Sequence, residues 1–149
     1  MTAAVAREMD GLSFVRMLVS GEVAPPIAST LGVTAEAVEQ GRVVFGMDPE
    51  EFHFNPIGSV HGGVFAALLD SAMGCPVHSA LPAGVRYTTL DISVKYLRPL
   101  GLDSGHVRCE GVVVHLGTRT ALAEGRLYDG EGRLCAHATS TCMLLRPQR

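Results

Sequence analysis

One carboxylate stands inside an apolar run of this sequence. Residues 64–73 read Val-Phe-Ala-Ala-Leu-Leu-Asp-Ser-Ala-Met, which places apolar groups on every face of a helix around Asp70. A helix that is apolar all round is buried, and an unpaired buried carboxylate costs several kcal/mol, so Asp70 must be paired, protonated or open to a cavity. In a desolvated cavity it would serve as a base or nucleophile. The alternative is that Asp70 binds a neighbouring strand or faces solvent at an edge.

Two glycines, Gly62 and Gly63, follow a loop and open the same predicted helix. The first turn of a helix has unbonded N–H groups and a partial positive charge. A glycine there lets a ligand oxygen approach the backbone closely. This construction could form an oxyanion hole for acyl transfer and contribute to substrate binding, although Gly-Gly before a helix also serves tight packing alone.

The spacing of these residues adds a geometric constraint. Gly62 and Asp70 are eight residues apart, which is about 12 Å along a helix. One small reacting group cannot contact both on a single helix. If both are functional, they come from different subunits, with two antiparallel helices side by side. The spacing then predicts a symmetric dimer with two shared sites.

The surrounding pattern predicts the elements that position this helix. Leu12, Val15, Leu18 and Val19 recur at helical spacing in residues 11–20, so a short helix is expected there. Strands are expected at about 27–38, 42–47, 85–97, 105–116, 119–128 and 133–145, separated by glycine-rich turns. Short connections make the sheet antiparallel, and one helix must cover most of it, so the predicted fold is α+β with a sheet curled around a central helix. Pro76 predicts that this helix kinks or ends near Cys75.

Composition excludes several classes of function. The chain has 149 residues and a net charge of −3, and it lacks Trp. This suits one domain over residues 1–149 and gives no reason to expect nucleic acid or an anionic membrane as partner. No signal peptide or bilayer-spanning run is visible, so a cytoplasmic protein is expected. The four cysteines show no CxxC spacing and read as buried free thiols, while His106, His115 and His137 are scattered, so no metal site is expected.

Two segments together resemble a known family. These are HFNPIGSVHGGVFAALLD at residues 53–70 and TTLDISVKYLRP at residues 88–99. They resemble the hotdog-fold acyl-CoA thioesterase superfamily, and within it the PaaI-like and 4-hydroxybenzoyl-CoA thioesterase group. The likeness covers roughly residues 25–146. The combined spacing is the specific part: Asn55, six residues to His61, and nine more to Asp70.

The resemblance implies catalytic roles for five residues. Gly62 would supply the N–H that polarises the thioester carbonyl, and Asn55 would hydrogen-bond near the thioester or the attacking water. Asp70 would be the general base or the nucleophile, two routes that sequence does not separate. His61 would order the loop and the helix start. Thr89 would orient the water.

The assignment of Thr89 conflicts with simple strand alternation. Leu90, Ile92, Val94 and Tyr96 form the apolar set of the strand at 85–97. Thr88 shares their face, and Thr89 alternates to the other. A bulge or a dimer seam would resolve this, so Thr89 is predicted and Thr88 is kept as the alternative.

The resemblance also implies the partners of the protein. Coenzyme A would bind between subunits, with Arg98, Thr118 and Arg119 as candidate contacts, each of which could instead be a solvated surface residue. No cofactor is implied. The expected assembly is a homodimer with shared sites, arranged as a dimer of dimers.

The predicted function is hydrolysis of an acyl-CoA thioester with an aryl, arylacetyl or medium-chain acyl group. Phe65, Leu69 and Met73 could face that group. The alternative is a non-catalytic acyl-CoA- or lipid-binding protein on the same fold, which would not need a buried carboxylate. Hotdog hydratases pair an acid with a histidine five residues on, and position 75 is Cys, so that activity is not predicted.

Overall fold

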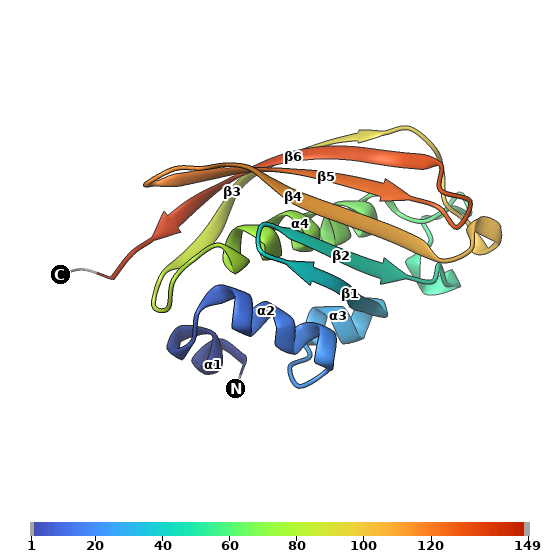
Figure 1. Ribbon diagram of the computed structural model, residues 1–149. Helices are drawn as coiled ribbons and strands as arrows, with labels where there is room; N and C mark the ends of the chain where they lie inside the picture. The colour runs from blue at the N-terminus through green and yellow to red at the C-terminus, as the bar shows by residue number, and fades with distance from the viewer. Residues whose placement is uncertain (1, 148–149) are drawn as a thin grey trace.

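A computed structural model describes residues 2–147; Met1 and residues 148–149 of the predicted domain lie outside this range. The helices are α1 (Thr2–Glu8), α2 (Gly11–Ser20), α3 (Pro26–Leu31) and α4 (Gly62–Ser79). The strands are β1 (Val33–Glu39), β2 (Arg42–Met47), β3 (Arg86–Tyr96), β4 (Val107–Leu116), β5 (Thr120–Tyr128) and β6 (Leu134–Leu145). They form one antiparallel sheet in the order β1-β2-β4-β5-β6-β3. The sheet curls around α4, while α1, α2 and α3 gather on one side of the molecule (Figure 1). The predicted fold, a curled antiparallel sheet around a central helix, is confirmed.

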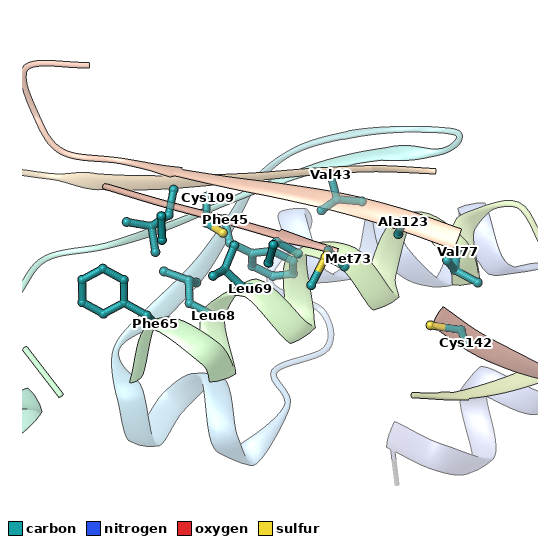
Figure 2. Packing of buried hydrophobic residues seen from close by; sticks show 14 of the residues in the cluster. Val43, Phe45, Phe65, Leu68, Leu69, Met73, Val77, Cys109, Ala123 and Cys142 are labelled. Carbon is teal, nitrogen blue, oxygen red and sulfur yellow. The ribbon is translucent and has the colours of Figure 1, made fainter. Parts of the chain in front are cut away.

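The core lies between α4 and the concave face of the sheet. Figure 2 shows Leu68, Leu69 and Met73 directed from α4 toward the strands, where side chains such as Phe45 meet them. Phe65, at the start of the helix, is buried in the same cluster. Leu69 and Met73 are fully buried. The suggestion that Phe65, Leu69 and Met73 face an acyl group is therefore wrong, because this stripe of α4 is the face that packs on the sheet.

Two paired glycines let α4 approach the middle of the sheet closely. Gly111 on β4 and Gly125 on β5 are cross-strand partners. A Cβ on Gly125 would lie 3.0 Å from both Leu69 and Met73, and a Cβ on Gly111 would lie 1.6 Å from the carbonyl oxygen of Ala72. Residues with side chains at these two positions would push the helix away from the strands.

The helix α4 is longer than predicted, and the extra residues follow the turn that lies against Gly111. The sequence predicted a kink or an end near Cys75. The helix runs on through Pro76 to Ser79, so an end at Cys75 is wrong. Pro76 has no N–H to donate to the Ala72 carbonyl. That oxygen instead meets the bare backbone of Gly111, and buried apolar neighbours such as Val77 hold the last turn in place.

The predicted helix at 11–20 is confirmed as α2. Asp10 caps its first turn by accepting a hydrogen bond from the Ser13 N–H at 3.0 Å. The predicted strand at 27–38 is partly wrong, because its first part forms α3 and only β1 is extended. Pro26 occupies the first position of α3, and Gly32, at φ 65°, ends it in the left-handed conformation. A proline start and a glycine end are helix signals that outweigh the short apolar pattern.

The strand β3 forms an edge of the sheet. It pairs with β6 along its length, and its register slips between Thr89 and Asp91, which makes Leu90 a bulge. Large apolar side chains are exposed on or just after this strand: Leu90 (52%), Tyr96 (54%) and Leu97 (56%). Among the helices described, none has the length and apolar character needed to cross a membrane.

Candidate active site

Asp70 lies in the middle of α4, half-buried, beside the edge strand β3. Its Oδ1 accepts a hydrogen bond from the Thr89 hydroxyl at 2.9 Å. No ion pair among residues 2–147 includes Asp70. A hydroxyl donor fixes the carboxylate orientation without neutralising its charge, so Asp70 keeps an oxygen with which to accept a proton or attack carbon.

The bulge in β3 explains why Thr89, rather than Thr88, reaches Asp70. The extra residue Leu90 shifts the alternation, so Tyr87 and Thr89 turn toward α4 while Thr88 and Leu90 are exposed. The prediction that placed Leu90 on the apolar face is wrong for the same reason. The bulge therefore aims one hydroxyl at the carboxylate.

Two groups near Asp70, Cys75 and Tyr87, are uncharged. Burial, followed by the nearby charge of Asp70, raises the pKa of Cys75 to about 12. Burial also raises the pKa of Tyr87, with smaller contributions from Cys75, Cys142 and Asp70. The Tyr87 hydroxyl lies over Gly74, where an added Cβ would be 2.4 Å from it. Both groups therefore stay protonated near neutral pH, and Cys75 is not a thiolate nucleophile.

The start of α4 holds a second set of predicted residues. His61 is the N-cap, and its Nδ1 accepts the Gly63 N–H at 2.8 Å. The Gly63 N–H is thus already used. In the described part of the chain, the Gly62 N–H donates to no acceptor. It is free at the positive end of a helix, which is the arrangement that can bind a developing oxyanion.

Tyr96, which the sequence did not indicate as a site residue, fixes the position of Gly62. Its hydroxyl donates to the Gly62 carbonyl at 2.7 Å, and its ring packs edge-on against Phe65 with centroids 5.4 Å apart. The alternation pattern placed Tyr96 only on the apolar face of its strand. This hydrogen bond joins segments 34 residues apart, so no local signal could have indicated it.

Asn55 organises the loop before α4. Its Oδ1 accepts the backbone N–H groups of Ile57 (3.0 Å) and Ser59 (3.2 Å), and its Nδ2 donates to the Ser59 hydroxyl at 3.1 Å. The main chain on either side is tied down too, since the His61 N–H donates to the carbonyl of His53. Within one chain the Asn55 side chain thus shapes the loop.

The predicted catalytic residues therefore fall into two half-sites within one chain. The loop half-site consists of Asn55, His61 and Gly62, and the carboxylate half-site consists of Asp70 and Thr89. Because Gly62 and Asp70 belong to the same helix, they are separated by about 12 Å. One chain does not bring the free N–H and the carboxylate to a single small reacting group.

The candidate coenzyme A contacts are also split. Arg98 follows the end of β3, and its N–H donates to the Cys135 carbonyl at the start of β6. Thr118 and Arg119 lie in the β4–β5 turn, where the Arg119 carbonyl accepts the Leu144 N–H near the end of β6. These two ends of β6 are about 30 Å apart. All three side chains are exposed.

The other chemistry-bearing residues form no metal site in the described range, where no group of three candidate ligands lies together. The four cysteines are free; Cys109, Cys135 and Cys142 are buried, and Cys75 is half-buried.

Comparison with known proteins identifies the family. The sequence profile of the thioesterase superfamily matches residues 57–136, more than half of the chain. The chain belongs to the thioesterase superfamily. The matched range includes both Gly62 and Asp70 in α4, and Thr89 in β3, so the superfamily assignment rests on the part of the chain that holds the carboxylate half-site. The family assignment therefore makes this protein a thioester hydrolase.

Individual relatives of this thioesterase have names that are consistent with the family assignment. A Halobacterium salinarum protein named as an esterase is 36% identical over 103 residues, which cover 66% of each chain. The 1,4-dihydroxy-2-naphthoyl-CoA hydrolase of Listeria monocytogenes is 22% identical over 123 residues, 83% of this chain and 98% of that one. A crystal structure from Ralstonia eutropha, described as a thioesterase related to phenylacetic acid degradation, has a TM-score of 0.77 at 30% identity, covering 87% of this chain and 98% of that one. The hotdog fold and the PaaI-like resemblance are confirmed.

Proposed function

We propose that this thioesterase hydrolyses acyl-coenzyme A thioesters with an aryl, arylacetyl or medium-chain acyl group. The observation that carries the proposal is Asp70, a half-buried carboxylate that is held by the Thr89 hydroxyl and forms no ion pair with a cation among residues 2–147. A protein that only binds acyl-CoA has no use for such a group. The names of two relatives, a naphthoyl-CoA hydrolase and a thioesterase related to phenylacetic acid degradation, support an aromatic acyl-CoA.

The geometry supports two routes for hydrolysis. In one, Asp70 takes a proton from water, and the hydroxide adds to the thioester carbon. In the other, Asp70 itself adds and forms a mixed anhydride that water then hydrolyses. In both, a free N–H such as that of Gly62 would stabilise the oxyanion. In the first route, the C–S bond breaks as the tetrahedral adduct collapses, and the departing thiolate takes the proton that Asp70 accepted. In the second route, the C–S bond breaks as the anhydride forms, and the thiolate takes its proton from water. Hydrolysis of the anhydride then releases the acid and restores the Asp70 carboxylate.

Either route needs Gly62 and Asp70 on one thioester, so we propose that two chains share each site. The edge strand β3 supports a dimer, because an unpaired edge of 11 residues, with exposed Leu90 and Tyr96 on it and exposed Leu97 just after it, favours pairing with another strand. A two-fold axis at this edge would make the two α4 helices antiparallel neighbours. The carboxylate half-site of one chain would then face the loop half-site of the other.

The arrangement of two such dimers as a tetramer is a further proposal from the family resemblance. Leu122 and Met143 are exposed on the outer face of the sheet, at 38% and 41%, and could contribute to this second interface. Light scattering would measure the assembly. A monomer at micromolar concentration would contradict the shared site.

Thiol release from a panel of aryl-, arylacetyl- and medium-chain acyl-CoAs tests the activity. Asp70→Asn keeps the shape of the side chain and removes its charge, and it should lower kcat at least a hundredfold. Asp103→Asn, an exposed carboxylate in the loop after β3, is the matched control and should change kcat less than about twofold. Unchanged turnover in Asp70→Asn would contradict the role of Asp70. Binding of acyl-CoAs without thiol release by the wild type would favour the binding protein instead.

A further inference from the structure

A cavity of about 450 Å³ lies between the N-terminal helices, β1 and α4. Its lining includes Leu18 from α2, Ala28 and Leu31 from α3, Ala35 from β1, and Ala67 and Ser71 from α4. The helices α2 and α3 form a wall outside the curled sheet (Figure 1). Some lining residues, such as Ile27 at 58% exposure, reach the surface, so the cavity can be entered. Its volume is in the range of small-molecule sites.

The cavity runs along the flank of α4 that lies next to Asp70. Ala67, Ser71 and Cys75 line it, and residues spaced by four form one stripe along a helix. Ser71 directly follows Asp70, and Ala67 precedes it by one turn. Asp70 itself does not line the cavity, so an acyl group whose carbonyl carbon is at Asp70 would enter this space past the neighbouring Ser71.

The other flank of α4 has no such room. Leu69 and Met73 are fully buried on that flank. The space beside them is so small that a Cβ added at Gly125 would lie 3.0 Å from both side chains. Of these two flanks, the one with Ala67, Ser71 and Cys75 has space for an acyl chain.

The lining also limits the chemistry of the occupant. It contains no charged side chain; its polar members are Ser29, Thr34, Ser71 and the thiol of Cys75. Since burial raises the pKa of Cys75 to about 12, that thiol contributes no charge. An acyl group with an ionised substituent would be desolvated there without a partner, whereas an apolar one gains by leaving water.

We propose that this cavity binds the uncharged, apolar acyl group of the thioester, and that α2 and α3 set the longest acyl chain accepted. The inference rests on the proposed function, because it takes Asp70 as the point from which the acyl group extends. It assigns substrate selection to the N-terminal helices, while the chemistry stays with α4 and β3.

Binding of two unreactive thioethers, S-ethyl-CoA and S-octyl-CoA, tests the inference by calorimetry. Each methylene moved from water into the cavity should tighten binding about fourfold until the cavity is full. In wild type the octyl compound should therefore bind at least a hundredfold more tightly than the ethyl compound. Ala28→Phe fills the cavity from α3, so it should weaken octyl binding at least tenfold and ethyl binding less than about twofold.

Thr30→Phe is the matched control, because Thr30 is exposed on the same helix and is not part of the lining. It should leave both affinities unchanged. Ala67→Leu fills the cavity from α4 and should repeat the chain-length effect, which keeps the test valid if Ala28→Phe fails to fold. Equal effects on both thioethers, or none in either variant, would overturn the inference. Failure of both thioethers to bind the wild type would instead overturn the proposed function.

Discussion

The Thr89 hydroxyl, on a bulged edge strand, donates a hydrogen bond to Asp70 in the middle of the central helix at 2.9 Å. This contact orients a carboxylate that no described cation neutralises. It also ties α4 to the strand that we propose as the dimer edge. The orientation of the Asp70 carboxylate therefore depends on the register of β3.

Thr89→Val should lower the rate by removing the hydroxyl that orients Asp70, while leaving the fold intact. The change keeps a branched side chain but removes the hydroxyl, and a hydrogen bond to a charged group contributes about 1.5–3 kcal/mol. We expect kcat to fall about tenfold to a hundredfold with KM nearly unchanged. Thr89→Ser restores the donor and should recover most of the rate. Equal rates for the Val and Ser variants in steady-state assays would exclude this role for the hydroxyl.

Gly62→Pro should remove the free N–H with little damage to the helix. Proline is favoured at the first helical position, and the preceding His61 has ψ 135°, which a following proline requires. Loss of one oxyanion donor should lower kcat about a hundredfold to a thousandfold. Gly62→Ala is the control, since it places the same Cβ 3.3 Å from Tyr96 but keeps the N–H. The N–H has no such role if the Pro and Ala variants retain equal kcat.

Gly111→Ala should destabilise the protein. The new Cβ would lie 1.6 Å from the Ala72 carbonyl oxygen, which is backbone and cannot rotate away. Overpacking of this kind costs about 1–3 kcal/mol. Urea unfolding should show the loss, while Val112→Ala on the adjacent half-buried position should cost less. A wild-type midpoint for Gly111→Ala would show that the helix can move away from β4 freely.

His106 should make stability depend on pH. Its hydrogen bonds, first to Asp48 at 2.7 Å and then to Glu36, raise its pKa above the ordinary value of 6.5. Its contribution is therefore fully present below the unfolded pKa and is lost as pH rises through the higher folded pKa. All three side chains are partly exposed to solvent, from 29% for Glu36 to 74% for Asp48, so we expect this contribution to be less than about 1 kcal/mol.

The measurement for His106 compares wild type with His106→Gln by urea unfolding at roughly pH 6 and pH 9, on either side of the ordinary histidine pKa. The stability difference should be larger at the lower pH. A difference that grows with pH would mean that the neutral imidazole is the stabilising form.

Local sequence patterns correctly predicted those helices and strands whose own residues carry a clear periodicity. Alternation and turn glycines located β2 to β6, and the apolar run located α4 and the odd carboxylate within it. The helix α3 was missed although Pro26 and Gly32 mark its ends, because its short apolar pattern also fits a strand. The continuation of α4 past Pro76 was missed because the neighbours of its last turns, such as Gly111 beside the Ala72 carbonyl, are distant in sequence.

In the candidate site, too, features set by local spacing were predicted, whereas features set by contacts between distant residues were not. Spacing alone indicated that Gly62 and Asp70 are too far apart to act in one chain, and that holds in the structure. The choice between Thr88 and Thr89 needed the bulge at Leu90, which depends on the pairing of β3 with β6. The hydrogen bond from Tyr96 and the cavity behind α3 arise from tertiary packing, which no local pattern encodes.

The most direct test of the account mixes two inactive variants, Asp70→Asn and Gly62→Pro, by co-refolding or co-expression. If each site takes Asp70 from one chain and Gly62 from the other, a mixed dimer contains one intact site and one doubly changed site. Random mixing makes half of the dimers mixed, so the account predicts recovery of about one quarter of wild-type thiol release. If each chain holds a complete site, no mixture restores activity, and the absence of recovery in dimers shown to be mixed would contradict the shared site.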